Sequence, residues 1–244
     1  MTVTLRLLDQ QTFADLGTFV ARARRLEADG AARLVGHGQV LAVYVSPLHG
    51  GGGPTVLGLR TLALASPCDL DVTVPLAALG DRLAVPPAGA GDKAGGRADD
   101  RLYNRVDDGA EDVAEDGVAL AVPPMTASGA GWAGMSPPRS GWDPIGLVDP
   151  GLLRRVAADG IARVAAGTPD GAGAQAVARL RALIWGEPVP GLDDVPAGVA
   201  FAAEALGFLN TATDNEPAAL LRRGPWVRLT TATGHVLGRR SPLG

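Results

Sequence analysis

The sequence predicts an α+β protein with two lobes. Three observations support this fold class: strand and helix patterns share residues 1–84, residues 85–117 lack apolar periodicity, and largely helical patterns fill residues 118–244. Strands and helices that are grouped in this way, without regular alternation, are typical of α+β folds. We therefore expect an N-terminal strand–helix–sheet lobe and a mainly helical second lobe that is closed by a C-terminal β-hairpin.

The N-terminal lobe begins with a strand and a helix. Val3, Leu5 and Leu7 fall on one face, which is the period of a half-buried strand. Asp9 can then cap a helix over residues 12–26. Apolar residues at spacings of three and four define the predicted buried face of that helix: Phe13, Leu16, Phe19, Val20 and Ala23.

The rest of this lobe is predicted to be a sheet with one more helix. Residues rich in valine, leucine and alanine, bounded by glycine, proline and aspartate, predict strands at 32–35, 39–45, 56–65 and 72–74. A short helix over residues 76–83 follows. We expect the N-terminal α+β lobe to span residues 1–84.

Residues 85–117 are predicted to be a disordered acidic insertion rich in glycine, alanine and aspartate. Nine acidic residues lie between Asp92 and Asp116, and bulky apolar side chains are almost absent. Such a segment cannot bury enough apolar surface to offset the entropy of ordering its backbone.

The second lobe, residues 118–244, is predicted to contain a short strand from Val118, three helices and a closing hairpin. Asp149 and Pro150 provide an N-cap and a first-turn proline for the first helix. The helical patterns cover residues 151–166, 174–185 and 197–209, and the hairpin strands cover residues 226–231 and 235–239.

Composition excludes several classes of function. The formal net charge is −4 and the pI is about 5.4, so no concentrated basic face is expected and no nucleic-acid partner is predicted. The start of the sequence lacks the pattern of a signal peptide, and no run approaches the roughly 18 apolar residues of a membrane span. We predict a cytoplasmic protein without a membrane partner.

Cys68 is the single cysteine, which excludes an intramolecular disulfide and a multi-cysteine metal site. We interpret it as a small buried thiol, because nothing near it in the sequence would lower its pKa to that of a nucleophile.

No catalytic, cofactor-binding or metal-binding residue is predicted. The run from His49 to Gly53 is similar to an esterase oxyanion loop, but the G-x-S-x-G pentapeptide that this chemistry needs is absent, so we interpret the run as a hairpin loop. The glycine pattern over residues 171–176 follows a helical segment instead of a strand, which argues against a dinucleotide site. The histidines are too far apart in sequence to suggest a metal site.

Two segments rich in tryptophan and arginine form the candidate binding patch. Residues 131–146 combine a Pro-Pro step with large aromatic side chains, and the C-terminal hairpin adds a second concentration. Tryptophan and arginine are enriched at interaction hot spots; alternatively, the tryptophans fix the lobe junction and the charges lie on a solvated face. The candidate residues are Trp132, Arg139, Trp142, Trp226, Arg228 and His235.

Two resemblances accompany these patterns. The segments WAGMSPPRSGWDPIG, FAAEALGFL and GPWVRLTTATGHVLGRR resemble an uncharacterised family of actinobacterial proteins without an assigned activity, which implies a bacterial cytoplasmic setting. The order of elements in residues 1–84 is similar to one lobe of a sliding DNA clamp, although no clamp motif accompanies it.

The function predicted from the sequence is therefore a non-catalytic protein-interaction or assembly protein, with a protein partner or a homo-oligomer. The alternative is an enzyme or a small-molecule-binding protein whose pocket lies between the lobes and uses Arg139, His235 and the tryptophans. The two differ in an observable way: an enzyme needs these side chains to converge in a cleft, and an interaction protein needs an exposed patch.

Overall fold

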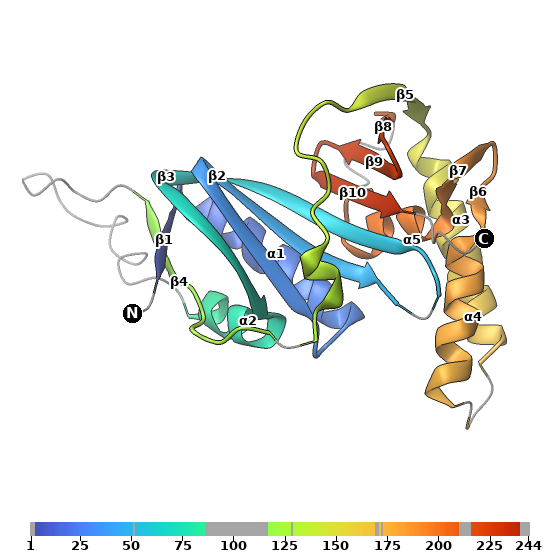
Figure 1. The fold of residues 1–244 in the computed structure, drawn as a ribbon, viewed down its shortest axis with the longest axis horizontal. Coiled ribbons are helices and arrows are strands. Elements are labelled where there is room, and N and C mark those ends of the chain that lie inside the picture. Colours follow the sequence, from blue (N-terminus) through green and yellow to red (C-terminus); the bar gives the residue numbers. More distant parts are fainter. Residues whose placement is uncertain are drawn as a thin grey trace, which may run out of the picture.

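A computed structural model describes residues 3–50, 52–85, 117–127, 129–168, 171, 173–209 and 216–239. The predicted insertion at 85–117 falls almost wholly outside the described residues. The chain is α+β, as predicted, with helices packed on a large antiparallel sheet (Figure 1). Among the described residues, no helix combines the length and hydropathy that a membrane crossing requires.

The first half of the chain forms a long hairpin that is backed by two helices. Its elements are β1 (Thr4–Leu7), α1 (Gln10–Leu26), β2 (Ala31–Leu48), β3 (Thr55–Pro75), α2 (Leu76–Ala84) and β4 (Val118–Ala121). Asp9 caps α1 as predicted, because its carboxylate accepts a hydrogen bond of 2.7 Å from the Thr12 backbone N–H. The five residues predicted for the buried face of α1 are all buried, which confirms that prediction.

The described residues of the second half form three helices and six strands, and four of these strands belong to the large sheet. Its elements are β5 (Asp143–Val148), α3 (Pro150–Ala166), α4 (Ala174–Gly186), β6 (Pro188–Val189), β7 (Leu192–Pro196), α5 (Ala197–Ala205), β8 (Ala218–Arg223), β9 (Trp226–Thr231) and β10 (Gly234–Arg239). The small pair β6–β7 forms a sheet of its own. Asp149 caps α3 and Pro150 opens it, as predicted.

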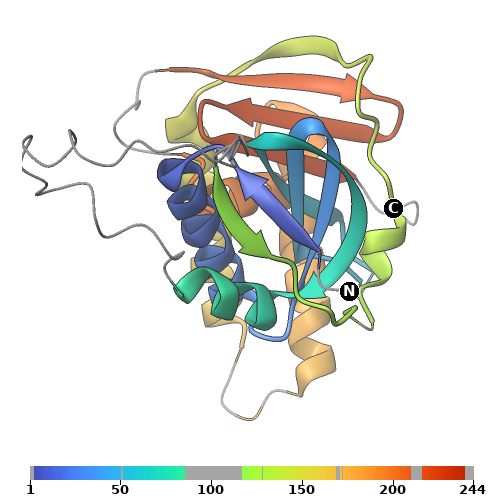
Figure 2. The same ribbon diagram turned by 90° about the vertical axis from the view of Figure 1, so that its left-hand side faces the viewer.

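One sheet passes through both predicted lobes. Its strand order is β4-β1-β3-β10-β9-β8-β5, and β2 also pairs with β3. Since β10 pairs with β3, from Leu59 opposite His235 to Thr55 opposite Arg239, the C-terminal hairpin continues the N-terminal sheet. Helices α1 and α2 lie against one face of this sheet, and a connecting segment crosses the other face (Figure 2). The division into the predicted lobes stays a prediction.

Several predicted boundaries are wrong. The strands expected at 32–35 and 39–45 are one strand, β2, because the ladder to β3 continues past Gly38 (φ +55°) through a register shift between Gly38 and Val40. The strands expected at 56–65 and 72–74 are likewise the single strand β3.

Two further differences concern the second half. The helix expected over residues 197–209 ends at Ala205, where Gly207 takes a positive φ of 72° and turns the chain. Strands β5 and β8 were not predicted. They extend the predicted hairpin into a four-stranded segment of the sheet.

Cys68 is only partly buried, so the expectation of a buried thiol is wrong. It lies on β3 opposite Gly38, next to the register shift, where the hairpin is incompletely covered. Partial burial raises the pKa of its thiol, which favours the unreactive protonated form.

Candidate functional site

The candidate site lies on the face of the sheet that is turned away from α1. A strap, defined as residues 129–142, crosses this face and contains a short 3₁₀ helix at Gly131–Gly134. Under it lies a small apolar cluster in which Trp132 and Trp226 are each only 5% exposed, together with Leu57 and Leu237. These two predicted patch residues are therefore part of the packing between strap and sheet.

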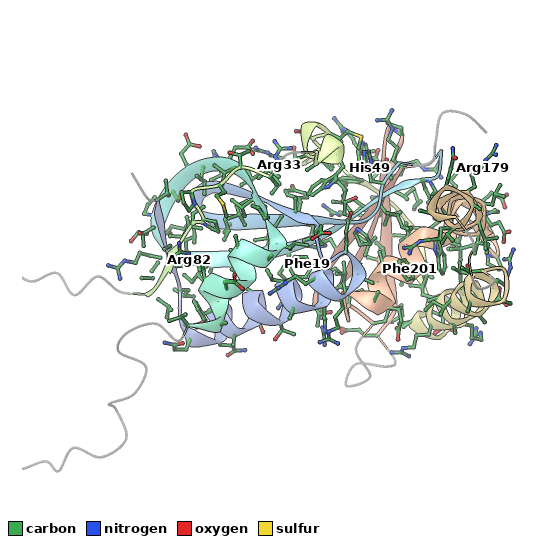
Figure 3. The ribbon with its side chains drawn as sticks, turned by 90° about the horizontal axis from the view of Figure 1, so that it is seen from below. Phe19, Arg33, His49, Arg82, Arg179 and Phe201 are labelled. Carbon is green, nitrogen blue, oxygen red and sulfur yellow. The ribbon has the colours of Figure 1, made fainter. Side chains whose placement is uncertain are left out.

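Arg33 of β2 holds the strap in place. The Arg33 side chain lies beside the short helix of the strap (Figure 3). Its Nη1 donates to the Ala133 carbonyl oxygen at 2.7 Å and to Ser136 Oγ at 3.2 Å, and its Nε and Nη2 donate to the Asp71 carboxylate at 2.8 and 2.7 Å. The hydrogen bonds from Arg33 hold the pKa of Asp71 below its ordinary value. The role of Arg33 was not predicted from the sequence, because a single arginine in a strand gives no sign of a contact about 100 residues away.

Trp142 and Arg228 form the most distinctive contact of the site. The Arg228 guanidinium lies over the Trp142 ring, 4.9 Å from its centroid, and the indole Nε1 donates to the Pro138 carbonyl oxygen at 3.0 Å. The Nε of Arg228 is buried without a hydrogen-bond partner, and no carboxylate within the described residues pairs with this guanidinium. Burial lowers the pKa of Arg228 from its ordinary value, because the charged form loses hydration.

His235 of β10 pairs with Thr230 of β9, and Thr230 lies two positions along β9 from Arg228. The side chains of His235 and Arg228 therefore lie on the same face of the hairpin. The Nδ1 of His235 lies 3.0 Å from Thr230 Oγ1. Burial lowers the pKa of His235, and the positive charges of Arg228 and Arg60 lower it further. We call Trp142, Arg228 and His235 the Arg228 patch.

Arg139 is exposed on the strap. Its charge lowers the pKa of Asp71 in addition to the larger effect of Arg33, which places it near the β2–β3 side of the strap. At the other end of the strap, the Arg223 guanidinium donates to the Gly141 carbonyl oxygen at 2.6 Å.

The structure thus brings all six candidate residues to the strap and the sheet face beneath it. Trp132 and Trp226 are buried, and the other four are at least partly accessible.

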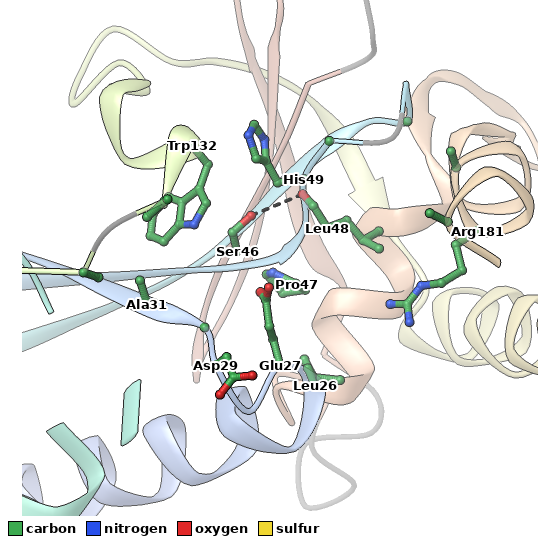
Figure 4. A pocket seen from close by; sticks show the side chains of 18 of the residues that line it. Leu26, Glu27, Asp29, Ala31, Ser46, Pro47, Leu48, His49, Trp132 and Arg181 are labelled. Atoms are coloured by element: carbon green, nitrogen blue, oxygen red, sulfur yellow. Dashed lines mark hydrogen bonds between the residues drawn. The ribbon is translucent and has the colours of Figure 1, made fainter. Parts of the chain in front are cut away.

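A cleft of about 870 Å³ opens beside the strap (Figure 4). It lies between the end of α1, the β2–β3 turn, the start of the strap and α4, and its lining includes Glu27, Asp29, His49, Trp132, Arg181 and Trp185. Of the residues expected to line a pocket between the lobes, Trp132 does so, and Arg139 and His235 do not. Arg139 and His235 therefore do not converge in this cleft, because His235 lies on the sheet face and Arg139 is exposed on the strap.

The charged residues of this cleft were not found from the sequence. Glu27 and Asp29 follow the end of α1, and Arg181 is one of several arginines in the second half of the chain. His49 was noted only as part of the glycine run, which does connect two strands, as predicted. Among the described residues, no group of three or more His, Cys, Asp and Glu side chains could hold a metal ion.

The fold and the site define an α+β protein with an aromatic and cationic surface on one sheet face. Comparison with protein families gives two matches: residues 1–99 match the domain of unknown function DUF8010, and residues 137–243 match the domain of unknown function DUF8185. These matches agree with the resemblance to an uncharacterised family. Comparison with curated proteins gives no match.

Among solved structures, the chain is similar to bacterial sliding clamps. A beta sliding clamp from C. crescentus, crystallised with PEG at a putative tethering region, has a TM-score of 0.47 and 14% identity, over 99% of this chain and 66% of that chain. A DNA polymerase sliding clamp from Caulobacter crescentus has a TM-score of 0.46 and 14% identity, with coverage of 100% and 66%. A DNA polymerase sliding clamp from Pseudomonas aeruginosa has a TM-score of 0.41 and 13% identity, over 100% of this chain and 65% of that chain. The likeness concerns the fold alone, and the chain spans 66% of the first clamp's length.

Proposed function

We propose that this chain is a non-catalytic protein-interaction protein and that its Arg228 patch binds an acidic segment of a protein partner. The observation that carries the proposal is the Arg228 guanidinium, which is partly buried, lies over Trp142 and lacks a carboxylate partner within the described residues. The partner is a different protein, and a second copy of this chain is the alternative that the experiment distinguishes.

The energetics of Arg228 support an anionic partner. A guanidinium that has lost hydration without gaining an acceptor costs free energy, as its lowered pKa indicates. A carboxylate that approaches it can accept two parallel hydrogen bonds, and the indole ring keeps the guanidinium plane in position for them. Arg33 already illustrates this geometry within the chain, because its Nε and Nη2 donate in parallel to the two oxygens of the Asp71 carboxylate.

The charges nearby also favour an acidic segment. His235 lies beside Arg228, Arg223 is exposed at the end of the strap, and Arg139 is exposed on the strap itself. The net charge of −4 argues against nucleic acid as the partner, because phosphate backbones require a broadly basic surface. The proposal includes the actinobacterial cytoplasmic setting that the sequence resemblance implies.

The test is a binding measurement on matched arginine variants. A fluorescein-labelled peptide with alternating glutamates serves as the acidic probe, and its anisotropy is followed with the wild type, with Arg228→Gln and with Arg179→Gln, which removes an exposed arginine of α4. We expect Arg228→Gln to weaken binding by about tenfold or more, since a hydrogen bond to a charged group contributes about 1.5–3 kcal/mol. Equal affinities of the three proteins would contradict the proposal.

Partner retention from native cells provides the second measurement. Arg139→Ala and Arg228→Gln are expected to leave the melting temperature nearly unchanged and to abolish retention of proteins that co-purify with the wild type. Sedimentation analysis of the same samples shows whether the retained species is a second copy of the chain. Retention of every wild-type partner by both variants would exclude the patch as the binding surface.

A further inference from the structure

We infer that the cleft beside the strap is a binding site for a small zwitterionic ligand with an apolar body, of the class of amino acids and short peptides. This inference does not rest on the Arg228 patch, because Trp142, Arg228 and His235 do not line the cleft. Three features of the cleft carry it: charges of opposite sign on two walls that pair with no described residue, a partly apolar lining and a rigid frame.

Charges of opposite sign line different walls of the cleft. Glu27 and Asp29 come from the end of α1, whereas Arg181 comes from α4 and its guanidinium extends toward the middle of the cleft (Figure 4). Within the described residues, none of the three side chains forms an ion pair. Each wall therefore offers a charge that no described group of the protein neutralises.

The position of the acidic pair has no explanation in helix stability. Glu27 is the C-cap of α1, and Asp29 lies two residues beyond it. Negative charge at the C-terminal end of a helix is disfavoured by the helix dipole, which favours the basic residues Arg24 and Arg25 in the last turn. Both carboxylates are exposed, and a cationic group bound beside them would offset this unfavourable charge.

Part of the cleft lining is apolar. Leu48 and Met125 line it, whereas Trp132 and Trp185, which are also among the lining residues, are only 5% and 2% exposed. The cleft volume of about 870 Å³ lies within the range of about 300–1,000 Å³ that is usual for small-molecule sites. An apolar ligand body can pack against Leu48 and Met125, and a ligand that is charged throughout would lose hydration there without compensation.

The frame of the cleft is fixed by close packing. Gly53 of the β2–β3 turn approaches α4 so closely that an added Cβ would lie 2.9 Å from Ala182 Cα. Trp185 stacks on Phe201 with ring centroids 4.5 Å apart, and its edge lies against Gly160. The strap and Arg33 hold Trp132 on the other side. A preformed site of this kind loses little entropy when a ligand binds.

The two charged walls determine the ligand class. An ammonium group fits the wall of Glu27 and Asp29, and a carboxylate fits the guanidinium of Arg181. A ligand with one charge would satisfy only one wall. Ser46 is not counted as a ligand contact, because its hydroxyl already donates toward the Leu48 and Val56 carbonyl oxygens at 3.3 and 3.4 Å.

The experiment uses a panel of free amino acids and of di- and tripeptides of Ala, Val, Leu and Phe with free termini. Binding to the full chain is followed by tryptophan fluorescence, since two of the four tryptophans line the cleft, and by calorimetry. Each ligand that binds is compared with its acetylated form, which lacks the cation, and with its amidated form, which lacks the anion.

The expected result is a cross-pattern between protein and ligand changes. Arg181→Gln should weaken binding of the free ligand by about tenfold or more and leave binding of its amidated form unchanged. The double variant Glu27→Gln/Asp29→Asn should weaken binding of the free ligand by a similar factor. It should leave binding of the acetylated form, which lacks the cation, unchanged. Arg179→Gln, on the same helix and outside the cleft, should bind as the wild type does.

Two outcomes would overturn the inference. One is the absence of binding by every member of the panel at about 1 mM, the upper end of weak specific affinities. The other is binding that is equally tight for free and blocked ligands. Arg228→Gln is included in the same series and should bind the zwitterions normally, so that failure of this inference is distinct from failure of the Arg228 patch.

Discussion

Two arginines on the same side of the sheet illustrate how surroundings decide the role of a side chain. Arg33 satisfies its guanidinium with Asp71 and the strap, so that it serves as a tether. Arg228 lies over an indole ring and has a buried Nε without a partner. The first arrangement is complete within the chain, and the second leaves a buried donor that no described group accepts from.

At the residue scale, His235 is predicted to make stability depend on pH. Its pKa is lowered in the folded state, mainly by burial, so the unfolded chain binds the proton more tightly. The contribution of neutral His235 is therefore full above the ordinary pKa of 6.5 and is lost as the pH falls below that value. Wild type should lose more stability than His235→Gln between about pH 7.5 and about pH 5.5, measured by urea unfolding.

An equal loss of stability in the two proteins over this interval would contradict the prediction. The chosen interval lies above the ordinary pKa of carboxyl groups, which limits their contribution to the difference. His235→Gln keeps a polar group near Thr230, so the change in charge is separated from a simple loss of packing.

At the scale of single elements, α1 is anchored by aromatic packing. Phe19 is only 3% exposed and lies 5.8 Å from Phe208, measured between ring centroids. Phe19→Ala should lower the free energy of unfolding by about 3–5 kcal/mol. Thr18→Ala, at an exposed position on the same helix, should change it by less than about 0.5 kcal/mol. A loss below about 1 kcal/mol for Phe19→Ala would mean that α1 is not anchored in this way.

The docking of α3 against α4 depends on a glycine. A Cβ at Gly160 would lie 2.2 Å from Cζ3 of Trp185, so Gly160→Ala should destabilise the protein by about 1–3 kcal/mol through overpacking. Gly17 of α1 is the matched control, because beyond its chain neighbours and the nearby backbone of its own helix no heavy atom lies within 4 Å of its added Cβ. Gly17→Ala should stabilise the protein by about 0.5–1 kcal/mol. Thermal unfolding of both variants measures the two changes in Tm, which should have opposite signs. Changes in Tm of the same sign would contradict the packing argument.

At the scale of the whole molecule, one sheet and one large apolar core connect the two halves of the chain. The core extends from Leu5 to Val236 and includes residues of α1, α3 and α5. We expect a single cooperative unfolding transition, with coincident curves from circular dichroism and tryptophan fluorescence. Phe19→Ala and Leu229→Ala, one substitution in each half, should both displace that one transition. Two separated transitions would show that the halves unfold independently.

The sequence alone was sufficient for the features that depend on local interactions. The caps at Asp9 and Asp149, the apolar stripe of α1 and the C-terminal hairpin were predicted correctly, because each is set by residues a few positions apart. The α+β class follows from these elements. The concentration of tryptophan and arginine near residues 131–146 was also apparent, and this segment does form the strap.

Only the tertiary structure decided which distant residues meet. The pairing of β3 with β10, the tether from Arg33 to Ala133 and the contact of Arg228 with Trp142 each join positions far apart in the chain. The cleft was invisible for the same reason, since Glu27 and Arg181 are brought to opposite walls by the packing of α4 beside the β2–β3 turn. Contacts of this kind depend on the burial of the whole apolar core, which no local pattern of residues encodes.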